Sequence, residues 1–262
     1  NAEMSPRVPA DEQTNRGDIT GRYEKKTNRH HGHQDLVAIV EALESAKTDE
    51  ETWRIIEKHF DVDQVVNYFA VNSLISHWDG FFNNFFVYYD REGTGKWTIH
   101  PWDQDSTWSQ RGGPAAELYE LPIFYGAEGA TPDGLVKVDR DLQRGRGRGG
   151  FGGFGFGGRG RGSMWWRSGG DFSRPMLANP TFYKRFQTRL DELTTKVFTK
   201  ESFGQRIDAL KSLEPEIRLR AELRKADEDA ALAEFQRNLA GLHEHLEKRH
   251  AFVRAKLKES SN

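Results

Sequence analysis

The chain contains no cysteine among its 262 residues, and this absence excludes whole classes of structure. Without cysteine there can be no disulfide framework and no zinc site built on thiolates. Long apolar runs are also absent, because no stretch approaches the ~20 residues that a membrane-spanning helix needs. Neither absence identifies the cellular compartment, since many exported bacterial proteins also lack cysteine.

The chain has little net charge, with a formal value of −2 at pH 7. This value argues against a uniformly basic surface for nucleic acid. Hydrophobic residues make up 36% and charged residues 30%, a polar composition that still permits a core. The length predicts one large domain or two small ones. The polar N-terminus shows no signal-peptide pattern.

Carboxylates, amides and aromatic residues are most densely interleaved between His77 and Asp105. Asp79 precedes Asn84 by five positions, which is the spacing in the catalytic loop of protein kinases. Phosphoryl transfer needs a carboxylate that accepts the proton of the attacking hydroxyl, and oxygen ligands for Mg²⁺. The pattern therefore predicts Asp79 as the catalytic base, Asn84 and Asp103 as ligands of Mg²⁺ and its bound ATP, and Asp105 as an extra metal ligand.

The residues between these carboxylates predict a β-hairpin at about 84–101. Residues 85–90 form an aromatic and β-branched run, residues 91–95 a turn, and residues 96–100 a returning strand. Such a hairpin would bring Asp103 back beside Asp79. We expect Trp78 and Trp102, each directly before an aspartate, to pack beneath the site. His77 is expected to support the loop through hydrogen bonds to the backbone and to take no part in acid–base chemistry.

A structural interpretation of the same residues stays open at this point. Asp79 could cap a helix or turn, and Asp103 and Asp105 could belong to a solvated loop. From the residues alone, the catalytic and structural interpretations are equally good. The histidines at 30, 31 and 33 could bind a metal, but no carboxylate cluster accompanies them, so a solvated loop is expected. The histidines at 243, 245 and 250 lack zinc-binding spacing, so a solvated helix face is expected.

Helical periodicity dominates the rest of the chain. Amphipathic or buried helices are predicted at 34–47, from 49, and at 61–77, with Thr48 as an N-cap and Glu51 as its capping-box partner. In the tail, Asn179 and Pro180 start one helix and Thr199 caps the next, which Pro215 interrupts. The last helix is predicted at 227–258. Its apolar seam consists of Leu232, Phe235, Leu239, Leu242, Leu246 and Val253.

Residues 144–162 are of low complexity, with five arginines, eleven glycines and three phenylalanines. Such a segment cannot bury enough apolar surface to fold. We interpret it as a flexible insertion. RNA binding through arginine and aromatic stacking is the competing interpretation, although so few charges would bind weakly at physiological salt.

Several motifs together resemble the CotH kinase family of spore-coat and cell-surface atypical protein kinases. The resemblance covers most of residues 23–257 and implies the catalytic role of Asp79, the metal role of Asp103 and the supporting role of Asn84. It also implies a protein substrate and an extracellular or cell-surface location. The segments that carry it are Tyr23–Thr27, Asn67–Asn72, His77–Gly80, Asn84–Tyr88, Lys96–Thr98, Pro101–Asp105 and Leu177–Pro180.

A kinase fold also needs an N-terminal lobe with a phosphate-covering loop and a strand lysine. The first 60 residues show no such pattern, so the N-lobe is expected to be absent from this chain. We expect residues 1–33 to be a polar lead-in, the remnant of a longer N-terminal region. Residues 34–262 are expected to form the C-terminal lobe of a kinase-like fold. The predicted fold class is α+β and mainly α, with the hairpin carrying the metal site.

Two functions from different classes follow. The first is an ATP-dependent and Mg²⁺-dependent protein kinase that acts on Ser or Thr of a partner protein and is active only with an N-lobe. Adenylylation and glutamylation on the same fold stay open. The second is an inactive kinase-fold module for surface attachment or interaction, against which the joint retention of Asp79, Asn84 and Asp103 argues.

Overall fold

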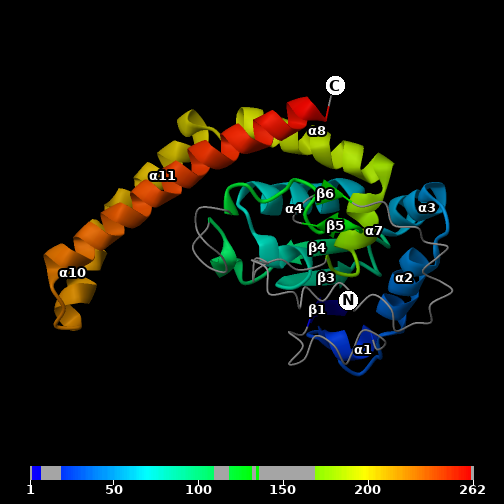
Figure 1. Ribbon diagram of the computed structural model, residues 1–262. Helices are drawn as coiled ribbons and strands as arrows, with labels where there is room; N and C mark the ends of the chain where they lie inside the picture. The colour runs from blue at the N-terminus through cyan, green and yellow to red at the C-terminus, as the bar shows by residue number, and fades with distance from the viewer. Residues whose placement is uncertain (1, 7–18, 109–117, 132–133, 136–168, 261–262) are drawn as a thin grey trace, which may run out of the picture.

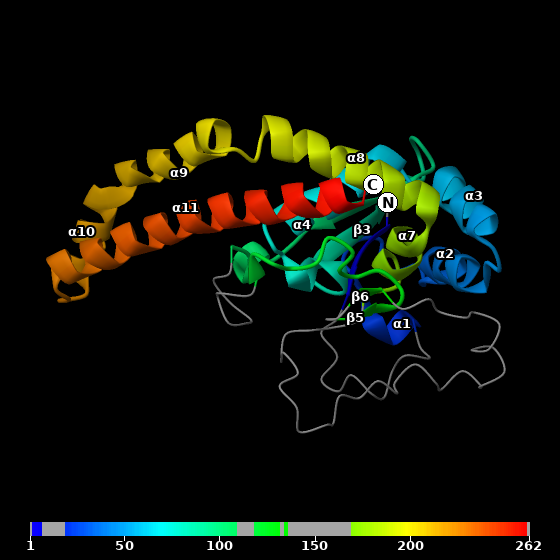
Figure 2. The same cartoon turned by 45° about the horizontal axis from the view of Figure 1, so that its top comes forward.

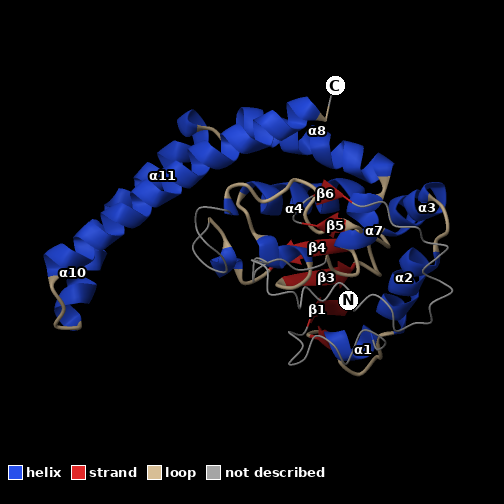
Figure 3. Cartoon of the chain, viewed as in Figure 1, coloured by secondary structure: helices blue, strands red, loops and turns tan. Residues whose placement is uncertain are grey.

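The computed structural model describes residues 2–6, 19–108, 118–131, 134–135 and 169–260. A small antiparallel sheet and the helices around it form the body, and a pair of helices extends from the body as an arm (Figure 1). Helices make up most of the described residues, as Figure 3 shows, so the expectation of a mainly helical α+β fold is confirmed. The Gly/Arg tract at 144–162 lies outside the described residues.

The sheet contains the predicted hairpin. Strand β3 (Phe85–Tyr89) pairs antiparallel with β4 (Trp97–Pro101), with Phe85 opposite Pro101. The turn between them is fixed by Asp90, whose carboxylate accepts the backbone N–H groups of Gly93 and Thr94. The side chains that point into the core are those of Phe85, Val87, Trp97 and Ile99.

The sheet is larger than the predicted hairpin, because the N-terminal segment contributes two strands. Strand β1 (Ala2–Pro6) pairs with β3, and β2 (Tyr23–Lys25) pairs with β1, which gives the order β2-β1-β3-β4. The expected polar lead-in therefore takes part in the fold. Its strands are short and polar, so they carry no alternating apolar signal. They are held by hydrogen bonds along an edge of β3, which no local pattern reveals.

Four helices precede or flank the sheet: α1 (Ile19–Arg22), α2 (Gln34–Ser45), α3 (Asp49–His59) and α4 (Val62–Leu74). The cap of α3 is the predicted one, since the Thr48 side chain accepts the N–H of Glu51 at 3.1 Å. The Glu51 carboxylate reaches back to the N–H of Lys47 at 2.7 Å. Helix α4 packs between β4 and α8, which makes it the central helix of the body.

The remaining elements follow the sheet. They are the short helices η1 (Trp78–Phe81) and η2 (Gln104–Ser106), the strand pair β5 (Ala130–Thr131) and β6 (Gly134–Leu135), and the tail helices. The tail comprises α7 (Ser173–Ala178), α8 (Pro180–Lys196), the π-turn η3 (Lys200–Gly204), α9 (Gln205–Ala209), η4 (Leu210–Leu213), α10 (Glu214–Leu223) and α11 (Glu228–Glu259).

The predicted caps of the tail helices are present. Asn179 accepts the N–H groups of Thr181 and Phe182, and Thr199 accepts that of Ser202. The expected interruption at Pro215 is present, because α9 ends at Ala209, η4 follows, and α10 begins at Glu214 with Pro215 in its first turn, where a missing N–H costs nothing. None of the described helices has the length and apolarity that crossing a membrane requires.

Helix α11 joins the body to the arm. Its C-terminal half lies beside α8 and α4, and its N-terminal half packs against α10 beyond the edge of the body (Figure 2). The helix begins at Glu228, with Asp227 as its N-cap, and ends at Glu259, close to the predicted bounds. Most of the buried residues of α11 lie in its C-terminal half.

Candidate functional site

The candidate catalytic loop starts where α4 ends. Helix α4 was predicted to extend to residue 77, but it ends at Leu74 because Ser76 has a left-handed backbone, with φ of 53°. The chain then turns through His77 into η1, which carries Asp79. The buried side chains of α4 fix the start of this loop in the core.

Asp79 and Asn84 are in direct contact. The Nδ2 of Asn84 donates to Oδ2 of Asp79 at 2.5 Å, and Oδ1 of Asn84 accepts from Asn83 at 3.1 Å. Asn84 adopts a left-handed backbone with φ of 52°, a conformation that asparagine tolerates better than most residues. This turn directs the amide back toward Asp79.

The second carboxylate loop lies against the first. The backbone N–H of Trp102 donates to the carbonyl oxygen of Asn84 at 3.1 Å, which joins the end of β4 to the start of β3. Asp103 follows with a left-handed backbone, φ 46° and ψ 68°, and leads into η2. The side chains of Asp103 and Asp105 are both exposed. Non-glycine residues in this conformation cost free energy and gather at functional sites.

His77 belongs to the first loop and contacts the second loop from inside the core. The imidazole is fully buried, and its Nδ1 lies 3.0 Å from Nε2 of Gln104 and 3.3 Å from Oδ1 of Asn72. Burial lowers the pKa of His77 to about 4, against the opposing influence of the Asp103 backbone and the Asp105 charge. The ring is therefore neutral near pH 7, in agreement with the predicted supporting role.

Gly80 is required at its position by the close approach of this histidine. A Cβ atom there would lie 2.5 Å from Nδ1 of His77, inside any normal contact. The carbonyl oxygen of Gly80 accepts a hydrogen bond from the hydroxyl of Tyr68 at 2.8 Å. Burial raises the pKa of Tyr68, so the phenol stays protonated and acts as a donor.

The two tryptophans of the site differ in placement. Trp78 is half-buried and packs on Phe82, with 5.9 Å between ring centroids. Trp102 is 57% exposed and meets Phe86 edge to face at 5.0 Å. The expectation that Trp102 packs beneath the carboxylates is therefore wrong, because its position at the end of β4 directs the ring to the outer face of the hairpin.

The oxygen atoms of the two loops fit a hard cation such as Mg²⁺. Magnesium is usually held by one or two carboxylates, with waters and substrate phosphates as the other ligands, and the exposed carboxylates of Asp103 and Asp105 are of the type that it prefers. Within the described ranges there is no group of three or more His, Cys, Asp or Glu side chains that could hold a metal ion alone. A site that needs phosphate oxygens to complete it is consistent with both observations.

Sequence analysis missed a second polar cluster behind the loop. Arg249 and His245 of α11 are buried, with Arg249 fully enclosed. The expectation of a solvated face for the histidines of this helix is thus wrong for His245. The sequence did contain a signal for this burial. Arg249 lies at the helical 3–4 spacing between Leu246 and Val253, so it occupies a position of the apolar seam.

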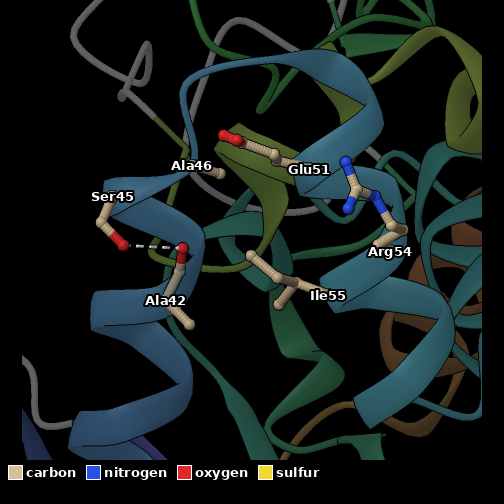
Figure 4. Close-up of a pocket in the computed structure, with 6 residues that line it drawn as sticks. All are labelled: Ala42, Ser45, Ala46, Glu51, Arg54 and Ile55. Carbon is tan, nitrogen blue, oxygen red and sulfur yellow. Dashed lines mark hydrogen bonds between the residues drawn. The ribbon is translucent and has the colours of Figure 1, made fainter.

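A shallow hollow of about 320 Å³ lies between α2 and α3 and is open to solvent (Figure 4). It is lined by small or aliphatic residues and by the charged residues Glu51 and Arg54. Both charged groups have local partners, since Glu51 accepts the N–H of Lys47 and Arg54 donates to the carbonyl of Glu50. None of its lining residues belongs to the candidate site.

Comparison with known proteins identifies a family. The family model described as "CotH kinase protein" matches residues 5–253. The chain is also 33% identical over 91 residues to the inner spore coat protein H of Bacillus subtilis (strain 168). That alignment covers 34% of this chain and 24% of the relative, so the aligned segment spans about a quarter of the relative's length.

Proposed function

This chain belongs to the CotH kinase family, and we propose that it is the catalytic part of a protein kinase. In this proposal it transfers the terminal phosphoryl group of ATP to Ser or Thr of a partner protein, with Mg²⁺. The observation that carries the proposal is the contact between Asp79 and Asn84 on a loop whose backbone is hydrogen-bonded to the loop of Asp103.

Asp79 acts as the base in this mechanism. Its carboxylate orients the substrate hydroxyl and accepts the proton as the oxygen bonds to the terminal phosphorus, while the bond from that phosphorus to ADP breaks. Asn84 donates to Oδ2 of Asp79 and so fixes the orientation of the carboxylate. Proton transfer to a positioned base of this kind contributes roughly 10²–10⁴-fold to a rate.

Asp103, Asp105 and the amide oxygen of Asn84 would hold Mg²⁺. The ion, when bound, neutralises the charge that develops on the phosphate oxygens. His77 and Gln104 fix the turn at Asp103, and a neutral imidazole adds no positive charge that would compete with the ion.

The proposal includes a requirement for an N-lobe. One lysine does lie on a strand of the described chain, Lys25 of β2, but its Nζ donates to the carbonyls of His31 and Gly32 at 3.0 and 2.6 Å. Its contacts close a local loop, so we assign it no role at the phosphates.

Because the named relative is a spore coat protein, we also propose a spore-coat or cell-surface location.

An interaction module is the second candidate, and exposed leucines on the arm favour it. Leu219 and Leu223 lie one turn apart on α10 and are 54% and 76% exposed. Neighbouring exposed apolar side chains are typical of interaction surfaces. In that case the kinase-like loops would be a scaffold and the arm would bind the partner. The two candidates differ in whether Asp79 matters for turnover.

Replacement of Asp79 by asparagine tests the proposal. The longest form of the protein that contains these residues is incubated with ATP, Mg²⁺ and a coat-protein extract, and phosphate incorporation is measured. We expect Asp79→Asn to lower the rate by about 10²-fold or more with nucleotide affinity little changed. Asp63→Asn, at an exposed position of α4, is the matched control. Equal incorporation by all three proteins would leave only the interaction module.

A further inference from the structure

Two polar side chains one turn apart on α11, His245 and Arg249, are buried against the back of the catalytic loop. Arg249 has no exposed surface, and His245 is 5% exposed. They lie in the half of α11 that covers the body (Figure 2). The active-site roles assigned above use neither side chain.

Arg249 joins two segments that are far apart in the chain. Its Nε and Nη2 donate to the carbonyl oxygen of Ser73, at 3.0 and 2.8 Å, in the last turn of α4. Its Nη1 donates to the carbonyl oxygens of Tyr119 and Leu121, at 2.9 and 2.5 Å. The guanidinium thus connects the entrance of the catalytic loop to the segment that follows the second carboxylate loop.

His245 adds a contact at the next turn of the same boundary. Its Nε2 lies 3.4 Å from Oγ of Ser76, the residue whose left-handed backbone ends α4. Its ring also meets the indole of Trp108 edge to face at 5.3 Å. The N–H of Trp108 donates to the carbonyl of Ile75 at 2.9 Å, so this contact also reaches the end of the second carboxylate loop.

The cost of burying Arg249 indicates that the guanidinium has a specific role. Among the described residues, no carboxylate forms an ion pair with it, and burial lowers its pKa to about 9. A hydrophobic residue would suit the same position in the seam, and such replacements of buried charges are often neutral or stabilising. What an apolar side chain could not do is donate to three carbonyls on two separate segments at once.

We propose that Arg249, supported by His245, is a positioning residue that holds the entrance of the catalytic loop and residues 118–121 in one fixed relation. This inference rests on the proposed function. In that function, the arrangement holds the loop that carries Asp79 in a fixed position relative to residues 118–121. A lysine cannot replace it, because one ammonium group cannot span the acceptors on both segments.

Hydrogen–deuterium exchange of the whole protein tests the structural half of the proposal. We expect Arg249→Lys to speed exchange by about tenfold in residues 73–84 and 118–125, with the β3–β4 hairpin and α8 unchanged. Arg254→Lys is the matched control, because Arg254 lies on the same helix but bonds Asp191 and Thr195 of α8. Uniformly faster exchange, or no change, would overturn the proposal.

Turnover tests the functional half. In the same preparations, Arg249→Lys should lower the rate of transfer to a protein substrate by about tenfold to a hundredfold, with nucleotide affinity within about twofold. Faster local exchange in Arg249→Lys without loss of turnover would reject the positioning role. Absence of transfer by the wild-type protein would reject the proposed function, and the exchange pattern would still decide whether Arg249 couples the segments.

A second variant covers the case in which Arg249→Lys does not fold. His245→Gln keeps a neutral polar side chain and removes the ring contact with Trp108. It should speed exchange in residues 73–84 without affecting α8. Unchanged exchange there would overturn the proposal without any use of the arginine variant.

Discussion

The amide of Asn84 donates to the carboxylate of Asp79 at 2.5 Å, and Asn84 does so from a left-handed backbone with φ of 52°. The contact closes the candidate catalytic loop across the five-residue interval between the two residues. Two separate properties of Asn84 are therefore needed, its tolerance of this backbone and its amide group. Mutations can separate these two properties.

Asn84→Gly and Asn84→Ala form a matched pair for that purpose. Both remove the amide, but only alanine strains the left-handed backbone, so we expect the alanine variant to be less stable by about 1 kcal/mol. Both variants should lose turnover alike, because neither can hold Asp79. Denaturant unfolding gives the stability difference, and phosphate incorporation gives the activity. Equal stability of the two variants would contradict the role assigned to the backbone.

Asp103→Asn should weaken Mg²⁺ binding while leaving the fold intact. Asparagine keeps the shape of the side chain and tolerates the φ of 46° found there, but it removes the negative charge. We expect Mg²⁺ affinity in the presence of ATP to fall by about tenfold or more, as measured by titration calorimetry. Glu92→Gln, at an exposed position in the hairpin turn, is the control. Unchanged affinity would remove Asp103 from the metal site.

Acid should destabilise the protein through His245. Burial, with a smaller contribution from the charge of Arg249, lowers the pKa of His245 to about 3 from its usual 6.5. Between those two values the unfolded chain binds a proton that the folded protein does not, so stability rises with pH there and falls as pH drops from 6.5 toward 3. The contribution is about 1.4 kcal/mol per pH unit.

His245→Gln should reduce this pH dependence, as measured by denaturant unfolding between pH 4 and pH 7 (about the span in which the two states differ). His100→Gln, at an exposed position of β4, is the control and should leave the slope unchanged. An identical slope in wild type and His245→Gln would show that the imidazole is not held neutral by burial.

Deletion of residues 144–162 should leave the melting temperature nearly unchanged. The closure entropy of a flexible loop changes only slowly with its length, and the glycines of this tract are costly to order. After the tract, Gly170 is anchored independently, because its N–H donates to the carbonyl of Phe81 at 2.9 Å. A collapse of the fold, seen by calorimetry, would show that the tract is structural.

The same deletion separates two functional interpretations of the tract. If the arginines favour acidic protein substrates, turnover of an acidic substrate should fall more than that of a neutral one, and added salt should reduce the difference. Loss of RNA binding at physiological salt, measured by filter binding, would instead favour a nucleic-acid role.

Local interactions explain why much of this protein could be predicted from its sequence. The caps at Thr48, Asn179 and Thr199 and the hairpin at 85–101 depend on residues within one turn or one strand pair of each other. The contact between Asp79 and Asn84 is of the same kind. Patterns of residue type and spacing are sufficient for features of this range.

Only the tertiary structure decided the features that depend on distant segments. The pairing of β1 with β3, the exposure of Trp102 and the burial of Arg249 beneath Ser73 each join residues whose own neighbourhoods in the sequence predict something else. The charged neighbours of Arg249 and His245 on a long helix predict solvated side chains. Arg249 is buried because the carbonyl groups of Ser73, Tyr119 and Leu121 need donors there, and His245 is buried beside the hydroxyl of Ser76. These requirements arise only when the chain is folded.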